Sequence, residues 1–128
     1  MPTRPLSPHL FIYRFGYTMT LSILHRLTGV ALSAGFLMLA WWLMALAWGE
    51  PAYRPLTTGI GAILLRVVLA LWLVAFIFHL ANGVRHLFWD AGWGLEKAQA
   101  RRSARIVIVV VAIAAFTLVY LFFLRGAK

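Results

Sequence analysis

Three long apolar runs constrain the fold of this 128-residue chain more than any other feature. They extend from Leu27 to Trp48, from Ile60 to His79 and from Ile106 to Leu124. A helix of about 20 apolar residues crosses a hydrocarbon core of about 30 Å, so each run is long enough to span a membrane. Apolar residues make up 63% of the chain and charged residues only 12%, which is too apolar for a soluble domain of this size. We therefore predict an all-α integral membrane bundle of three transmembrane helices.

The polar segments divide the chain into an arm and three spans within a single membrane domain, residues 1–128. We expect the N-terminal arm over residues 1–21 and the spans approximately over residues 22–48, 60–88 and 104–125. A short loop, Gly49–Thr58, joins the first two spans, and a longer polar stretch joins the last two. The arm lacks the basic, apolar and small-residue order of a cleaved signal peptide.

The chain has a net charge of +9, because its twelve Lys and Arg residues are balanced only by Glu50, Asp90 and Glu96. Basic residues between apolar runs orient a membrane protein, with the more basic side in the cytoplasm. Eight lie on the side of the N-terminus and the second connection: Arg4, Arg14, Arg26, Arg85, Lys97, Arg101, Arg102 and Arg105. Four lie on the opposite side: Arg54, Arg66, Arg125 and Lys128. We predict a cytoplasmic N-terminus and a C-terminus outside; no basic patch interleaved with aromatic residues indicates a nucleic-acid partner.

Two of the predicted spans carry a polar stripe near their cytoplasmic ends. Residues spaced by three or four positions share one face of a helix. The stripe of the first span comprises Ser22, His25, Arg26, Gly29 and Ser33. The stripe of the second span comprises His79, Gly83, His86 and Asp90. Because consecutive spans are antiparallel, both stripes lie on the same side of the membrane.

His79 is the histidine of these stripes that lies deepest. With Arg85 at the membrane boundary, His79 is about 9 Å further in at 1.5 Å per residue, whereas His25 and His86 are near the boundary. An ionisable side chain at that depth costs free energy unless it has a partner. Two interpretations stay open: a histidine hydrogen-bonded to another helix, or a ligand of haem iron, for which Gly83 leaves room. The chain has no cysteine, and a second axial histidine at this depth would have to come from another subunit.

The other polar residues have simpler interpretations as well. Arg26 and Arg85 could extend toward the interface as membrane anchors. His86 and Asp90 could be interfacial residues, with Asp90 paired to Arg85 or Lys97. Ser22 could bond back to its own backbone.

Three segments of the sequence resemble a known family: "RPLSPHLFIY" (residues 4–13), "SILHRLTG" (22–29) and "HLANGVRHLFWDAGWGL" (79–95). They are similar to the cytochrome b membrane-anchor subunit of succinate dehydrogenase, respiratory complex II. The resemblance implies an electron-transfer subunit of succinate:quinone oxidoreductase, with no succinate-oxidising site on this chain. It also implies haem b shared with a second membrane-anchor subunit that packs against this one, ubiquinone as substrate, and an iron–sulfur subunit and a flavoprotein subunit as further partners beside the lipid bilayer.

The resemblance assigns roles by position. His79 matches the axial ligand of the haem iron, and His25, Arg26 and His86 match positions near the haem. Ser22 and Arg26 match residues of the ubiquinone pocket, and Asp90 matches an acid close to it. A bacterial inner (cytoplasmic) membrane is expected, with the mitochondrial inner membrane also open. The alternatives are a small transporter or proton-relay subunit that uses an intramembrane histidine, and a structural anchor without haem.

Overall fold

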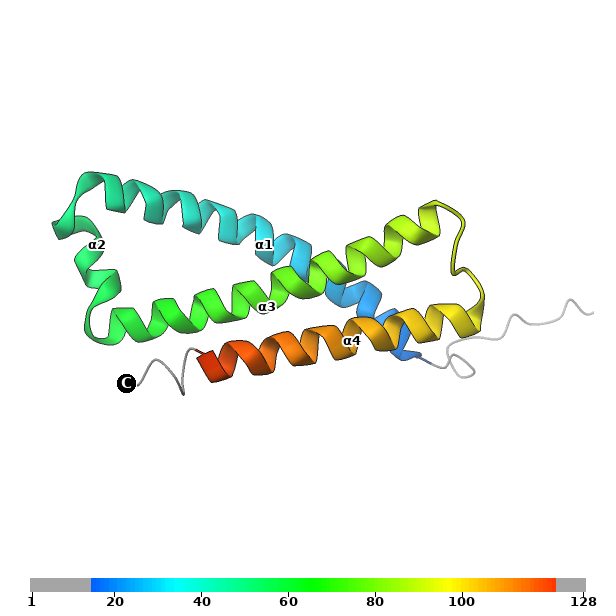
Figure 1. Cartoon of the computed structure of the whole chain (residues 1–128). Helices are drawn as coiled ribbons and strands as arrows, with labels where there is room; N and C mark the ends of the chain where they lie inside the picture. Colours follow the sequence, from blue (N-terminus) through cyan, green and yellow to red (C-terminus); the bar gives the residue numbers. More distant parts are fainter. Residues whose placement is uncertain (1–14, 122–128) are drawn as a thin grey trace, which may run out of the picture.

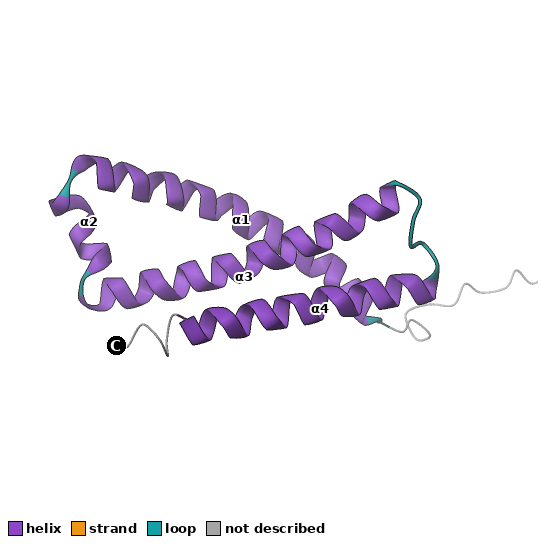
Figure 2. Ribbon diagram, viewed as in Figure 1, coloured by secondary structure: helices purple, strands orange, loops and turns teal. Residues whose placement is uncertain are grey.

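The computed structural model describes residues 15–121, which form four helices and no strand. They are α1 (Tyr17–Trp48), α2 (Glu50–Thr57), α3 (Gly59–Asp90) and α4 (Lys97–Val119), as Figures 1 and 2 show. By length and composition α1, α3 and α4 can each cross a membrane. The predicted all-α fold with three spans is therefore confirmed. The first of the three resembling segments, residues 4–13, lies outside the described residues, as does the end of the predicted third span.

Helix α1 begins at Tyr17, ahead of the first apolar run, because its first turn is held by a tertiary contact. The backbone of Gly16 is extended and precedes the helix without a side-chain cap. The hydroxyl of Tyr17 donates a hydrogen bond of 3.2 Å to the backbone oxygen of Arg101 in α4. This bond joins the start of the first span to the start of the third, so the two ends lie on one side of the bundle.

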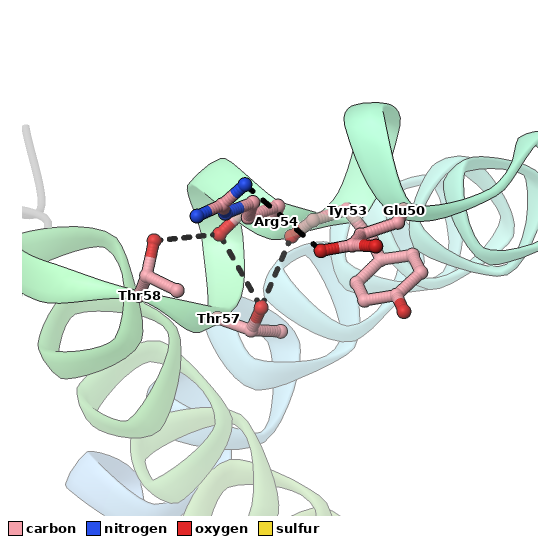
Figure 3. A network of polar contacts seen from close by, with 5 residues as sticks. All are labelled: Glu50, Tyr53, Arg54, Thr57 and Thr58. Carbon is pink, nitrogen blue, oxygen red and sulfur yellow. Dashed lines mark hydrogen bonds and ion pairs between the residues drawn. The ribbon is translucent and has the colours of Figure 1, made fainter.

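The connection between the first two spans is a short helix, α2, rather than the expected irregular loop (Figure 1). Proline is favourable in the first turn of a helix, and here it follows Glu50 directly. The carboxylate of Glu50 pairs with Arg54 one turn later at 4.0 Å, although both side chains are largely exposed. The hydroxyls of Thr57 and Thr58 both donate to the backbone oxygen of Arg54, at 3.3 and 2.9 Å (Figure 3). These local bonds end α2 and turn the chain into α3.

Helix α3 is the central element of the bundle. Figure 1 shows α1 crossing it on one side, α4 running alongside it in the opposite direction, and α2 bridging the far ends of α1 and α3. The buried cluster where the three spans meet comprises Leu21 of α1, Phe78 of α3, and Ala104 and Val107 of α4. It lies near the start of α1, at the end of the bundle that carries the polar stripes.

Helices α1 and α3 approach closely at Gly35. A Cβ atom at this position would overlap the indole ring of Trp72, so the absence of a side chain at Gly35 lets that ring lie against the backbone of α1. The same indole makes an edge-to-face contact with Phe36, with ring centroids 5.8 Å apart. Small residues at helix contacts are typical of membrane bundles, where close packing replaces the hydrophobic drive. This contact fixes the register between the two helices that carry the stripes.

Much of the surface of the three spans is apolar. Side chains such as Leu37 and Val30 are 76% and 72% exposed, far more than a chain in water tolerates over such an area. In a bilayer these faces contact lipid tails or the helices of other subunits. The architecture therefore agrees with a membrane-embedded chain that exposes apolar faces to its surroundings.

Candidate functional site

The polar stripes meet at a group of three histidines between α1 and α3. The rings of His25 and His79 stack with centroids 4.0 Å apart and an angle of 12° between their planes. The ring of His86 lies 5.1 Å from that of His25, tilted by 39°. All three side chains are half-buried. Two helices far apart in the sequence thus place three imidazoles in direct contact, which we call the histidine cluster (His25, His79 and His86).

His79 is held through one nitrogen of its ring. Its Nδ1 lies 3.1 Å from the backbone oxygen of His25 and 3.2 Å from Oγ1 of Thr28. The Thr28 hydroxyl lies 2.8 and 2.9 Å from the carbonyl oxygens of Leu24 and His25, and donates its single proton to them. A backbone oxygen can only accept, so the proton between His25 and His79 belongs to Nδ1. Nδ1 therefore donates, and Nε2 carries the free lone pair, with no hydrogen bond to any described residue.

Two glycines make room for this arrangement. A Cβ atom at position 29 would lie 3.1 Å from Cε1 of His79, tighter than ordinary van der Waals contact. A Cβ atom at position 83 would lie 3.7 Å from Cε1 of His25, which is ordinary contact. Gly29 is therefore the more constrained of the two, because it lets the His79 ring lie against the backbone of α1.

The predicted difference in depth between His25 and His79 was wrong. Counting residues along each helix separately placed His25 near the membrane boundary and left His79 alone inside. In the structure the two ring centroids are 4.0 Å apart, so the depths of the rings differ by no more than that distance. Counting along separate helices could not give this result, because the contact depends on where α1 crosses α3.

The residues predicted to hold quinone lie on the same part of the bundle, but no hydrogen bond or ion pair within residues 15–121 joins their side chains. Ser22 is half-buried, whereas Arg26 and Asp90 are exposed. Nε of Arg26 bonds weakly, at 3.5 Å, to the backbone oxygen of Ser22 one turn earlier. No hydrogen bond or ion pair within residues 15–121 joins Asp90 to Ser22, Arg26, Arg85 or Lys97.

Arg85 is buried between helices, so its side chain is not an exposed anchor. Its side chain is 5% exposed and its guanidinium lies between α3 and α4. Nε donates to the Ser103 hydroxyl at 2.9 Å, Nη1 to Oδ1 of Asn82 at 3.3 Å, and Nη2 to the backbone oxygen of Ala100 at 3.1 Å. Asn82 and Arg85 are three residues apart, so their contact on one face of α3 could have been predicted from the sequence. Ser103 could not be found from spacing because it lies on another helix.

Trp89 connects this network to the histidine cluster. The guanidinium carbon of Arg85 lies 4.0 Å from the centroid of the Trp89 ring, a cation–π contact. Trp89 also makes an edge-to-face contact with His86 of the histidine cluster, with ring centroids 5.1 Å apart. The indole nitrogen of Trp89 donates to the backbone oxygen of Gly94 at 3.0 Å, which fixes the ring.

The histidine cluster offers one oriented imidazole, that of His79, whose Nε2 is free to bind a metal ion. Among the described residues no group of three or more His, Cys, Asp or Glu side chains could by itself hold a metal ion. A metal bound here would therefore need most of its ligands from elsewhere. An iron ion that already has four ligands in a macrocycle meets this condition, because it takes only axial ligands from protein.

These features define a polytopic helical membrane protein with an oriented histidine between its first two spans. The family model that describes the succinate dehydrogenase/fumarate reductase transmembrane subunit matches residues 1–119. The chain belongs to this family.

Curated relatives agree over most of the chain. The succinate dehydrogenase cytochrome b556 subunit of Paracoccus denitrificans is 40% identical over 120 residues, which cover 93% of this chain and 92% of the relative. The cytochrome b556 subunit of Rickettsia felis is 45% identical over 106 residues, covering 83% and 82%. The mitochondrial cytochrome b560 subunit of Homo sapiens is 35% identical over 117 residues, covering 90% and 69%. These relatives are subunits of an enzyme complex, so this chain is a membrane subunit of the same type.

Proposed function

We propose that this chain binds haem b together with a second membrane-anchor subunit and forms part of the site where ubiquinone is reduced with electrons from succinate. The geometry of His79 is the observation that carries the proposal. Its Nδ1 proton is committed to the backbone oxygen of His25 and to Thr28, so Nε2 is left as the atom that can ligate iron. Metal-ligating histidines generally donate their other ring nitrogen in this way.

The surroundings of His79 fit a haem group. Gly29 removes the side chain that would press against the ligand ring. Nδ1 of His25 is buried without a hydrogen-bond partner among the described residues, and a buried polar atom of this kind needs one. A donor or acceptor on a bound cofactor would satisfy it. Haem supplies one-electron transfer when it is bound here.

The second axial ligand belongs to another subunit in this proposal. His25 and His79 lie face to face, 4.0 Å apart, so their rings leave no room for an iron ion between them. A histidine of the second anchor subunit is the donor that completes the site.

The quinone residues act near the same end of the bundle. A quinone that accepts electrons develops negative charge on its carbonyl oxygens. The hydroxyl of Ser22 can donate to such an oxygen, and Arg26, a permanent cation one turn later, stabilises the charge. Arg26 is exposed, and within residues 15–121 its side chain bonds only to the backbone oxygen of Ser22, at 3.5 Å, so it is free to turn toward a ligand. Asp90 lies at the end of α3 and exchanges protons with the cytoplasmic side.

The remaining subunits complete the enzyme. An iron–sulfur subunit and a flavoprotein subunit dock on the side that carries the histidine cluster and oxidise succinate. The excess of basic residues supports a cytoplasmic location for that side, and a bacterial inner membrane is the location we propose. The alternative of a transporter is not supported, because the three spans are continuous helices without the interruptions that mark substrate sites in transporters.

The test compares two activities of the purified complex carrying Ser22→Ala. We expect ubiquinone reduction by succinate to fall by about tenfold or more, the effect of removing one hydrogen bond to developing charge. Reduction of an artificial dye, which takes electrons before the quinone site, should stay at the wild-type level. Ser33→Ala is the matched control, because the Ser33 hydroxyl donates only to Gly29 of its own helix at 3.0 Å. Equal loss of both activities would contradict a quinone role for Ser22.

A further inference from the structure

A hollow of about 450 Å³ opens between α3 and α4, on a face that the haem and quinone residues do not use. Its volume lies within the range of small-molecule sites. The deep end is lined by the apolar side chains of Ala81 and Val107, and the outer end by Phe88 and Trp93. Ala81 and Phe88 are seven residues apart, or about 10 Å along the helix. The hollow therefore runs from the membrane interior to the interface, and we call it the α3–α4 groove.

The groove carries positive charge and no acid. Arg85 and Arg102 are among the residues that line it, and none of the lining residues is Asp or Glu. Arg102 is exposed at the outer end, in the same part of α4 as Arg101 and Arg105. The pattern along the groove is thus apolar inside the membrane and cationic at its surface.

Arg85 is the residue that most strongly indicates a bound anion in the groove. It is a permanent cation with 5% of its surface exposed, and its hydrogen-bond acceptors are all neutral: the Ser103 hydroxyl, the Asn82 amide and the Ala100 carbonyl. Neither of the described acids at this end, Asp90 and Glu96, pairs with it. A buried charge normally has a counter-charge, since burial without one is costly. Within the described chain the counter-charge is missing.

We propose that the α3–α4 groove binds an anionic phospholipid, with its phosphodiester near Arg85 and Arg102 and the upper part of an acyl chain against Val84 and Val107. The membrane supplies this ligand at the depth where the groove lies. The choice of a lipid over a quinone follows from charge, because a neutral headgroup would leave Arg85 uncompensated. The choice over a peptide follows from the apolar walls, which extend into the hydrocarbon region.

The test measures lipid binding to the complete detergent-purified complex by native mass spectrometry. Phosphatidylglycerol or phosphatidylcholine is titrated into delipidated complex, and the apparent affinity is read from the bound fractions. A cationic side chain near a membrane surface contributes about fivefold to the binding of an anionic lipid, so Arg102→Ala should weaken phosphatidylglycerol binding by about that factor. Arg101→Ala is the matched control, because it removes the same charge one position away and Arg101 does not line the groove.

A second variant tests the apolar part of the groove. Val84→Trp fills it without changing charge and should also reduce phosphatidylglycerol binding. Equal affinity for the two lipids in the wild-type complex, or equal loss in Arg101→Ala and Arg102→Ala, would overturn the proposal. Displacement of the lipid by inorganic phosphate alone would overturn it too, since the groove would then be a site for a free anion. Protection of Arg102 by another subunit in the delipidated complex would show that protein covers the groove, which also contradicts the proposal.

Discussion

Replacing Thr28 by valine tests whether its contact with Nδ1 orients the His79 ring for the proposed ligation through Nε2. Valine keeps the shape of threonine and removes the hydroxyl that accepts from Nδ1 at 3.2 Å. Loss of such a second-shell partner typically weakens metal binding by 10- to 100-fold. Nδ1 retains a second acceptor, the backbone oxygen of His25 at 3.1 Å, so the effect should lie at the lower end. We expect about tenfold weaker haem binding, or about 1.4 kcal/mol.

The assay is the rate of haem transfer from the purified complex to excess apomyoglobin, together with the haem content of the complex as isolated. Thr28→Val should lose haem about tenfold faster than wild type. Thr28→Ser keeps a hydroxyl at the same position and should restore the wild-type rate. The matched control is Thr117→Val, because the Thr117 hydroxyl donates only to Ile113 of its own helix at 2.9 Å.

Two results would contradict the proposed role of Thr28 and would leave His79 as the proposed haem ligand. If Thr28→Val and Thr117→Val lose haem at the same rate as wild type, the hydroxyl contributes nothing and the His25 carbonyl alone orients His79. If Thr117→Val loses haem as fast as Thr28→Val, the effect belongs to membrane packing in general.

Three further predictions concern packing, the buried arginine and topology. Gly35→Ala should lower the thermal stability of the complex by about 1–3 kcal/mol, because the new Cβ overlaps the Trp72 indole; an unchanged melting temperature would contradict the close approach of α1 and α3. Arg85→Leu should destabilise the complex by a similar amount or more, since it leaves the acceptors on Asn82 and Ser103 without their donor, whereas wild-type stability would mean that the network is not needed. A reporter fused to the C-terminus should respond as extracytoplasmic, and a cytoplasmic response would overturn the orientation inferred from charge.

The sequence was sufficient to predict the three spans. Helix length and apolar content are local properties, so the three spans follow from composition alone. The periodicity of three and four residues likewise placed His79 and His86 on one face of α3, and the structure brings both into the histidine cluster. The short helix α2 was not predicted, because two prolines in a short segment usually prevent a helix. One of them lies in the first turn, where proline is favourable.

The contacts between helices could not be predicted in the same way. The stacking of His25 on His79 depends on where α1 crosses α3, which a one-dimensional pattern does not contain. The burial of Arg85 depends on Ser103, which lies on α4, 18 positions later in the chain. In both cases the sequence identified the polar residue correctly, but its partner came from a different helix.

The central claim is that His79 ligates the haem iron through Nε2. The most direct measurement is the reduced-minus-oxidised absorption spectrum of the purified complex carrying His79→Ala, compared with His25→Ala. We predict that His79→Ala abolishes the b-type haem band, and that His25→Ala keeps it, because the acceptor that position 25 offers to Nδ1 is a backbone oxygen. A full b-type band in His79→Ala would contradict the account.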